Sequence, residues 1–277
     1  MPPRNIKIVY IEDSAGDRER YSGYLRRCKG IQVIPLGPPE TPDARVIERY
    51  NPDIVLVDYF LHERQPGRPG VSCKGLTLSA TLREKLPKVP ILLVTRGNLL
   101  RRLGMVRDIS GVFDELVFKD QISADPASLC DDVRVLVDGF RRLQACEVRH
   151  WSSLCDALRA KSEEKELLLQ ADPPKAVREN KTWQVPDVAS WIRSVLVKYP
   201  GILYGSLYAS VLLGITKHSF LLPSVQKWFA TARYTGVFLP KEGLWWRDRL
   251  IVKAYALFHK TGMDRASLGH FRDAWKK

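Results

Sequence analysis

The sequence predicts an α/β protein in which a doubly wound, five-stranded parallel sheet is followed by a long connecting helix and a mostly α-helical C-terminal domain. Three observations carry this prediction. Short apolar runs recur through the first half of the chain with helix-length segments between them, which is typical of sheets covered by helices on both faces. Most of these runs end on a polar residue, as strands do at the ligand-binding edge of open α/β sheets. After residue 172 the chain becomes basic and rich in tryptophan.

The central strand is predicted within residues 51–60, NPDIVLVDYF. Its apolar residues are nearly continuous, which favours a parallel strand buried on both faces. Pro52 separates the strand from the helix before it, because a residue that precedes proline avoids the α conformation. The run ends on the carboxylate of Asp58, which we therefore expect at the ligand-binding edge of the sheet.

Further apolar runs predict the other strands of the sheet. The first run is followed by Glu12 and Asp13, a later run by Thr95, and the last run by Lys119. Because the carboxyl ends of parallel strands meet at one edge, we expect these side chains to gather beside Asp58. The predicted strands are residues 6–11, 31–36, 54–58, 89–94 and 115–118.

With these strand-end residues, positions 1–125 resemble the receiver domain of bacterial response regulators, which has a flavodoxin-like fold. The resemblance implies that Asp58 accepts a phosphoryl group from a histidine kinase or a phosphotransfer protein. It implies that Thr95 and Lys119 contact the phosphoryl oxygens. It also implies a Mg²⁺ site whose protein ligands are Glu12, Asp13, Asp58 and the carbonyl oxygen of Phe60.

The sequence departs from the receiver pattern at several positions near this site. Leu116 stands where receivers usually carry an aromatic switch residue, Asp120 replaces the proline after the lysine, and Arg96 replaces a small residue after the threonine. The loop 61–74 is about twice the usual length, and it is interpreted equally well as a lid or partner contact and as a solvated loop. These departures leave open an alternative function, a receiver-like scaffold or protein-interaction module that does not signal by phosphorylation.

The chain is long enough for two domains, and its net charge of +13 is unevenly distributed. Residues 1–125 form the receiver-like domain, and 126–172 the connecting segment. Residues 173–277 hold 17 Lys and Arg against 6 Asp and Glu, together with six of the seven tryptophans. This composition predicts a basic output domain that binds nucleic acid, although a membrane surface or an acidic protein also fits the charge.

The connecting segment predicts a helix that starts after Asp125 and continues beyond the sheet. Its apolar residues follow the rhythm of a coiled-coil seam, so we expect a homodimer through residues 126–158. Packing of the first half on the sheet explains some of the same positions. The residues of the stripe are Leu129, Val133, Leu136, Phe140, Leu143, Trp151, Leu154 and Leu158.

The C-terminal domain predicts mostly helices, separated by glycine and proline. Residues 210–228 weakly resemble a helix-turn-helix, but Pro223 falls inside the recognition helix, so an ordinary helical core is the favoured interpretation. Arg247 and Arg249 lie beside two tryptophans, which suits either phosphate contact with base stacking or a solvated face over a core. The predicted helices are residues 186–199, 203–213, 223–234, 245–260 and 264–275.

The cysteines and the apolar runs bear on location. Cysteines stand at positions 28, 73, 130, 146 and 155 without metal-binding spacing, so we predict free thiols in a cytoplasmic protein. We expect no signal peptide, because Arg4 and Lys7 lead directly into a strand that acidic residues follow. We expect no membrane span, because the most apolar later run, 201–215, is short and interrupted by glycine. We also expect no enzyme activity apart from phosphorylation and dephosphorylation at Asp58. The leading interpretation is a response regulator of a two-component system or phosphorelay.

Overall fold

The computed structural model describes most of the chain as two compact units. Unit 1 comprises residues 1–144 with 185–190, and unit 2 comprises 145–184 with 191–277. The sequence predicts three segments, whereas the structure joins the first part of the connecting segment to unit 1 and its remainder to unit 2. The described residues are 5–61, 75–97, 112–146, 150–198, 200–263 and 267–276.

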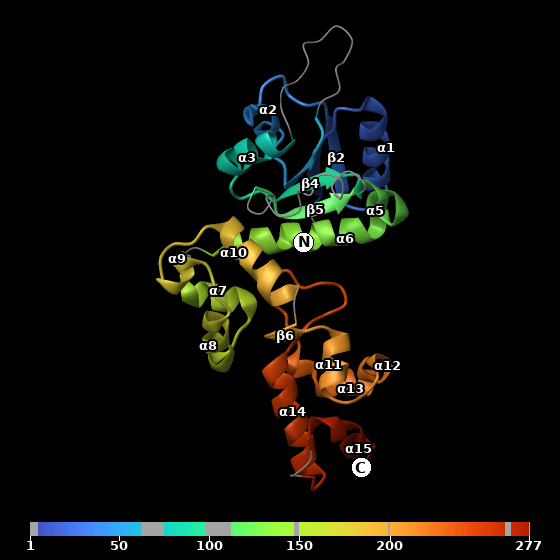
Figure 1. Ribbon diagram of the computed structural model, residues 1–277, viewed down its shortest axis with the longest axis vertical. Helices are drawn as coiled ribbons and strands as arrows, with labels where there is room; N and C mark the ends of the chain where they lie inside the picture. Colours follow the sequence, from blue (N-terminus) through green and yellow to red (C-terminus); the bar gives the residue numbers. More distant parts are fainter. Residues whose placement is uncertain are drawn as a thin grey trace. The chain divides into compact units, whose positions relative to one another are not determined.

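Unit 1 contains the predicted five-stranded parallel sheet, with the strand order β2-β1-β3-β4-β5. Helices cover both of its faces (Figure 1), so the prediction of a doubly wound sheet is confirmed. The strands are β1 (Ile6–Ile11), β2 (Ile31–Leu36), β3 (Ile54–Asp58), β4 (Ile91–Thr95) and β5 (Glu115–Phe118). The helices of this unit include α1 (Ala15–Arg26), α2 (Arg45–Glu48), α3 (Gly75–Lys85), α5 (Lys119–Ala124) and α6 (Pro126–Gln144).

The central strand β3 is buried throughout, as its apolar sequence predicts. Val55 and Val57 pack with Leu78 and Leu82 of α3 in one core cluster. Burying a side chain of this size contributes about 1.5–3 kcal/mol relative to leaving it exposed. The core on both faces therefore fixes the position of Asp58, the last residue of the strand.

Helix α1 begins at a side-chain cap next to the edge of the sheet. The Ser14 Oγ accepts a hydrogen bond from the backbone N–H of Asp17 at 3.3 Å. Such a cap satisfies one of the free N–H groups of the first turn, and an acidic side chain there is favoured by the helix dipole. The cap thereby places Asp17 beside the strand ends.

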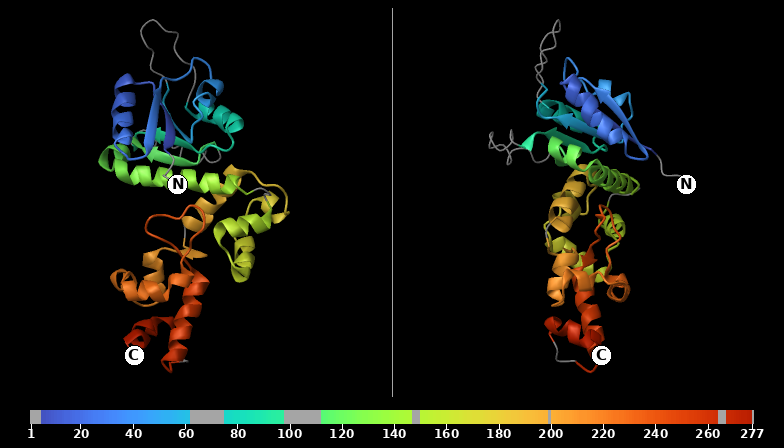
Figure 2. Two further views of the ribbon diagram at one scale, coloured as in Figure 1. Left: turned by 180° about the vertical axis from the view of Figure 1, so that it is seen from behind. Right: turned by 90° about the vertical axis from the view of Figure 1, so that its right-hand side faces the viewer.

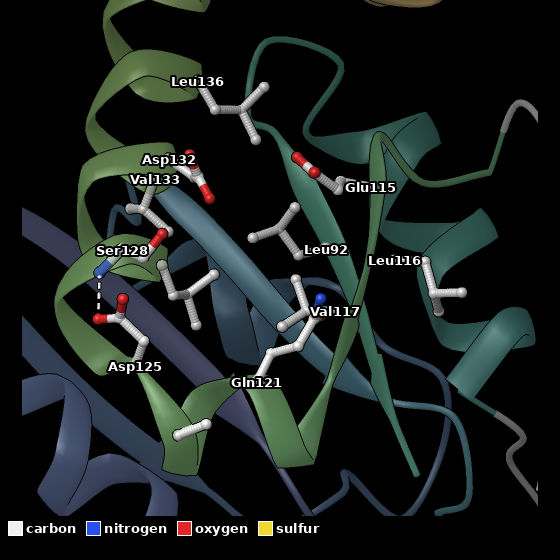
Figure 3. Close-up of a pocket in the computed structure, with 12 residues that line it drawn as sticks. Leu92, Glu115, Leu116, Val117, Gln121, Asp125, Ser128, Asp132, Val133 and Leu136 are labelled. Atoms are coloured by element: carbon white, nitrogen blue, oxygen red, sulfur yellow. Dashed lines mark hydrogen bonds between the residues drawn. The ribbon is translucent and has the colours of Figure 1, made fainter. Parts of the chain in front are cut away.

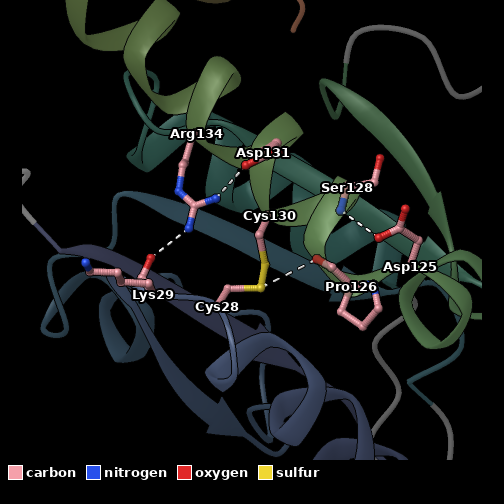
Figure 4. Close-up of a disulfide and its surroundings, with 8 residues drawn as sticks. All are labelled: Cys28, Lys29, Asp125, Pro126, Ser128, Cys130, Asp131 and Arg134. Carbon is pink, nitrogen blue, oxygen red and sulfur yellow. Dashed lines mark hydrogen bonds and ion pairs between the residues drawn. A yellow bond between two sulfur atoms is a disulfide. The ribbon is translucent and has the colours of Figure 1, made fainter.

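A disulfide joins Cys28, which follows α1, to Cys130 of α6, and Figure 4 shows the bond and its surroundings. It corrects the prediction that these cysteines are free thiols. The two residues are 102 positions apart with Cα atoms at 6.5 Å, a proximity that only the packing of α1 and α6 creates. Cys155 is a free thiol, Cys146 is not part of this bond, and Cys73 lies outside the described residues.

The loop after α1 has a second attachment to α6. Arg134 donates a hydrogen bond to the carbonyl oxygen of Lys29 at 2.7 Å and pairs with Asp131 at 2.7 Å. Both contacts lie beside the disulfide (Figure 4). The end of α1 is therefore held to α6 by covalent and polar contacts together.

The connecting segment is three helices, not the long helix that the sequence predicts. Helix α6 ends at Gln144, and α7 (Trp151–Leu158) and α8 (Ser162–Gln170) follow as part of unit 2. The stripe residues of α6 are buried within unit 1, and Leu154 and Leu158 are buried within unit 2. The expected seam is thus divided between two cores, and the homodimer stays a prediction.

Unit 2 is mainly helical and contains a small antiparallel sheet that the sequence does not predict. Strands β6 (Leu203–Tyr204) and β7 (Trp245–Trp246) pair where helix starts are expected. They are too short to leave a periodic signal, because a two-residue strand shows no alternation. Besides α7 and α8, its helices are α9 (Lys175–Arg178), α11 (Ser206–Leu212), α12 (Lys217–Phe220), α13 (Pro223–Trp228), α14 (Arg247–Lys260) and α15 (Phe271–Lys276). Helix α10 (Val185–Trp191) belongs to unit 1 except for its last residue, and a π-helical turn of unit 2, Ile192–Val197, follows it.

Aromatic residues form much of the core of unit 2. Figure 2 shows the backbone of this unit from two further sides. Phe220 and Trp245 contact edge to face, with ring centroids 5.0 Å apart. Helix α12 has only four residues, and Pro223 starts a new helix, so residues 210–228 form no long recognition helix. Within the described ranges of the chain, no helix is long and apolar enough to cross a membrane.

Candidate functional site

The strand ends of unit 1 bring the predicted acidic residues and the lysine together. Glu12 and Asp13 follow β1, Asp58 ends β3, and Lys119 follows β5. These residues and Phe60 line a cavity of about 230 Å³. Their meeting follows directly from the parallel direction of the strands.

Lys119 is the central contact of this site. Its Nζ lies 2.7 Å from Glu12 Oε2 and 3.0 Å from Asp58 Oδ1. The lysine side chain is 5% exposed, so the ammonium group is held among carboxylates away from bulk water. A cation so placed can also neutralise the charge of an anionic group bound at Asp58.

The carboxylates of the site interact strongly with one another. Burial raises the pKa of Glu12 to about 7, and the nearby charge of Asp58 acts in the same direction. Burial likewise raises the pKa of Asp58 to about 6, against the opposing effect of Lys119. Burial alone would lower the pKa of Lys119, but the charges of Asp58 and Glu12 raise it. The negative charge of the carboxylates at this site therefore exceeds the positive charge of Lys119.

The donor atoms fit a divalent cation. One carboxylate oxygen from each of Glu12, Asp13 and Asp58 lies within 4.8 Å of the others, and all three residues are buried. Carboxylate oxygens are the ligands that Mg²⁺ prefers. Phe60 donates its backbone N–H to Asp58 Oδ2 at 3.0 Å, which places it beside the same carboxylate. The ligand role of its carbonyl oxygen stays a prediction.

Thr95 ends β4 and is fully buried. It is not among the residues that line the cavity. Its Oγ1 has no hydrogen-bond partner among the residues that the structure describes. A buried hydroxyl without a partner is costly, which is consistent with a donor that is used when a ligand binds. Its role in phosphoryl contact stays a prediction.

Two further charged residues belong to the site. Asp17 Oδ2 lies 3.2 Å from Lys119 Nζ and 2.8 Å from Arg96 Nη2, and both Asp17 and Arg96 line the cavity. Asp17 is absent from the sequence-based set because it lies in a helix and not at a strand end. The signal that could have found it is Ser14, a common helix-capping residue three positions earlier in the sequence.

Gly75, the first residue of α3, lies directly against the backbone of Asp58 and Tyr59. Its N–H donates to the carbonyl oxygen of Tyr59 at 3.1 Å. A Cβ at this glycine would stand 2.0 Å from the carbonyl oxygen of Asp58. Only glycine allows this close approach of the helix start to the strand end.

A second cavity, of about 330 Å³, lies between β5, α5 and α6, and Figure 3 shows its lining. Its apolar residues include Leu92, Val117 and Val133, and acidic residues such as Glu115 and Asp132 also line it. None of the acidic ligand candidates and neither Thr95 nor Lys119 lines it. The smaller cavity, with the strand-end cluster, is therefore the candidate functional site.

The basic residues of unit 2 are placed differently from the sequence expectation. Trp245 and Trp246 are 1% exposed and cannot stack on bases. Arg249 forms an ion pair with Glu164 at 2.6 Å, with both side chains largely buried, so it stabilises the core. The basic and aromatic group nearer the surface is Trp228, whose ring lies 5.7 Å from Lys253 Nζ and 5.9 Å from Lys260 Nζ.

The chain was compared with known proteins. No protein-family model matches the sequence, and no curated protein matches it. Solved structures similar to it include the receiver domain of the NarL response regulator of Mycobacterium tuberculosis, with 18% identity, 48% of this chain and 98% of that chain covered, and a TM-score of 0.34. A LuxR-family response regulator of Aurantimonas has 24% identity, 48% and 85% coverage and a TM-score of 0.34.

The RcsB response regulator of Salmonella typhimurium has 16% identity, 70% coverage of this chain, 92% coverage of that chain and a TM-score of 0.35. The first half of this chain resembles response-regulator receiver domains, as the sequence predicts. The strand order of unit 1 and the positions of its strand-end residues come from this structure and not from the comparisons.

Proposed function

We propose that unit 1 is the receiver of a response regulator and accepts a phosphoryl group on Asp58. The observation that carries the proposal is the contact of Lys119 Nζ with Asp58 Oδ1 at 3.0 Å, in a cavity lined by three further carboxylates. This arrangement supplies a nucleophile, a fixed cation and a set of metal ligands at one strand edge.

In the proposed reaction an Asp58 carboxylate oxygen attacks the phosphorus atom of the donor. A P–O bond forms while the bond to the donor's leaving group breaks, and the leaving group departs with the bonding electron pair. Lys119 stabilises the charge on the phosphoryl oxygens, and Thr95 Oγ1 is the proposed second donor. Mg²⁺ bound by Glu12, Asp13 and Asp58 would offset the charge of these carboxylates and of the incoming group.

The proposed phosphoryl donor is a histidine kinase or a phosphotransfer protein, and the proposed location is the cytoplasm. The proposal includes no enzyme activity beyond phosphorylation and dephosphorylation of Asp58. Leu116 stands where receivers usually carry an aromatic switch residue. The proposal therefore assigns no mode by which phosphorylation changes the output domain. The loop 61–74, apart from Leu61, lies outside the described residues, and so its role as lid, contact or solvated loop stays a prediction.

Incubation with a small phosphodonor and Mg²⁺ tests this function. Intact-mass spectrometry should show one added phosphoryl group on the wild-type chain and none on Asp58→Asn. Asp120→Asn is the matched control, because Asp120 is exposed next to Lys119 and lines no part of the cavity. Equal labelling of Asp58→Asn and wild type would show that another residue is the acceptor.

A second candidate function is nucleic-acid binding by residues 173–277. The observation that favours it is the balance of 17 Lys and Arg against 6 Asp and Glu in this range. Lys253 and Lys260 lie beside the half-buried ring of Trp228, an arrangement suited to phosphate contact. The exposed side chains of Leu207 and Val211 on α11 favour the alternative, a protein-interaction module.

Titration of the full chain with DNA and RNA at two salt concentrations separates these alternatives. Binding through phosphates should weaken steeply as salt rises, because counterions are released. Lys253→Glu with Lys260→Glu should weaken binding to all sequences alike. Lys175→Glu with Lys181→Glu, two exposed lysines paired with Glu179, serves as the charge-matched control. Absence of salt-dependent binding would favour a protein partner.

A further inference from the structure

We propose that Arg96 is an additional phosphoryl-binding residue, which stays paired with Asp17 while Asp58 is unmodified. The inference rests on the proposed phosphorylation of Asp58 and deepens it. It concerns the position after Thr95, where this chain carries a long cationic side chain at the edge of the site.

A continuous series of charged contacts connects Arg96 with the acceptor. Arg96 Nη2 lies 2.8 Å from Asp17 Oδ2, the same oxygen lies 3.2 Å from Lys119 Nζ, and Lys119 Nζ lies 3.0 Å from Asp58 Oδ1. All four residues line one cavity. A change in the charge of Asp58 therefore changes the electrostatic potential at Arg96 through Lys119 and Asp17.

The two cations of this series differ in their freedom to move. The Lys119 side chain is 5% exposed, whereas the Arg96 side chain is 56% exposed. Lys119 is packed in place, so its contacts are set by the fold. Arg96 reaches the cavity from the solvent side, and its ion pair with Asp17 contributes little to stability because water screens it. Its guanidinium can therefore exchange partners at low cost.

A phosphoryl group on Asp58 changes the competition for these cations. It adds negative charge and several acceptor oxygens inside the cavity, whereas Asp17 offers one carboxylate at its edge. The guanidinium presents paired N–H donors in a planar fork that fits phosphoryl oxygens better than a lysine ammonium does. We therefore expect Arg96 to turn from Asp17 to the phosphoryl group and to close the solvent side of the site.

Binding of beryllofluoride, a phosphoryl mimic, to the full chain with Mg²⁺ tests this proposal by calorimetry. Arg96→Ala should lower the affinity about tenfold, which corresponds to one charge-assisted hydrogen-bond contact. Arg96→Lys keeps the positive charge and loses the planar fork of N–H donors, so its affinity should lie between those of the wild type and Arg96→Ala. Arg26→Ala is the matched control, because Arg26 is an exposed arginine paired with Glu19 on α1.

A double-variant comparison separates binding from a merely structural role. Asp17→Asn should raise the affinity several-fold when Arg96 is present, because the guanidinium is released, and should raise it less in the Arg96→Ala background, where only the contact of Asp17 with Lys119 is lost. Thermal midpoints without beryllofluoride show that each variant is folded. Wild-type affinity in both Arg96→Ala and Arg96→Lys would overturn the inference alone. A wild-type chain that binds no beryllofluoride and takes no phosphoryl group would overturn the proposed function, and this inference with it.

Discussion

Gly75 leaves no space for a side chain behind Asp58, the proposed acceptor. A Cβ would stand 2.0 Å from the Asp58 carbonyl oxygen and 2.9 Å from the Cα of Tyr59. Because both neighbours are backbone atoms, the strand end or the helix start must shift. We predict that Gly75→Ala lowers the free energy of unfolding by about 1–3 kcal/mol and slows phosphoryl labelling, as measured by urea denaturation and mass spectrometry.

Gly23 provides the control for this substitution. It lies within α1, and nothing stands within 4 Å of the Cβ that alanine would add. Gly23→Ala should raise the free energy of unfolding by about 0.5–1 kcal/mol through helix propensity. Equal stability of the two alanine variants would contradict the close approach at Gly75.

Glu164 and Arg249 form the buried ion pair of unit 2. Burial of Glu164 opposes its ionisation. The hydrogen bonds that it accepts from Arg249 and from the Lys161 N–H together outweigh this effect, so the pKa of Glu164 is lowered from 4.5. A lowered folded-state pKa stabilises the protein above the unfolded-state value, and this contribution is lost as pH falls through the folded-state value. We predict that Glu164→Gln costs roughly 2–3 kcal/mol at neutral pH.

The pH dependence of thermal unfolding checks this pair. The difference between wild type and Glu164→Gln should be full near pH 7 and should shrink steadily below about pH 4.5. Glu163→Gln, at the neighbouring exposed position, should cost little at either pH. A difference that stays constant from pH 7 to pH 3 would mean that the charge of Glu164 is not what stabilises the unit.

The sequence predicts site residues that directly follow strands and misses those placed by packing. Asp58 and Lys119 were found because an apolar run that stops at a polar residue also marks the edge of a parallel sheet. Asp17 was missed because a capped helix start has ordinary structural reasons for an acid. Arg249 was assigned to a surface because its partner Glu164 is 85 positions away in the chain.

At the scale of elements, the disulfide joins the end of α1 to α6. Closing a loop of 102 residues restricts the unfolded chain, and such a bond typically contributes about 2–4 kcal/mol. We predict that reductant lowers the urea midpoint of unit 1 in the wild type and has no effect in Cys28→Ser. Cys146→Ser should remain sensitive to reductant, since Cys146 is not part of the Cys28–Cys130 bond. Insensitivity of the wild type would mean that the thiols are not joined.

The strands of the first sheet were predictable and the connecting helix was not, for related reasons. An apolar run in β3 is buried whichever helices cover it, so the run alone identifies the strand. An apolar stripe that continues past Leu143 identifies burial but not the partner. Here the second part of the stripe turns into α7 and packs within unit 2.

At the scale of the whole molecule, the two units have separate hydrophobic cores. One cluster is built around β3 and α3, and another around α13, α14 and β7. Variants in different cores should act independently, because distant substitutions are usually additive. We predict two calorimetric transitions, of which Gly75→Ala lowers only one midpoint and Glu164→Gln only the other. A single transition that both variants shift would show that the units unfold together.

The bond between Cys28 and Cys130 makes the chain a macrocycle with two tails. The closed ring contains β2 to β5 and with them Asp58, Arg96 and Lys119, whereas β1 with Glu12 and Asp13 lies on the N-terminal tail. A single peptide-bond cut anywhere from residue 29 to 129 opens the ring but releases nothing. A nicked molecule would therefore run as one species on a denaturing gel until reductant separates it into two fragments.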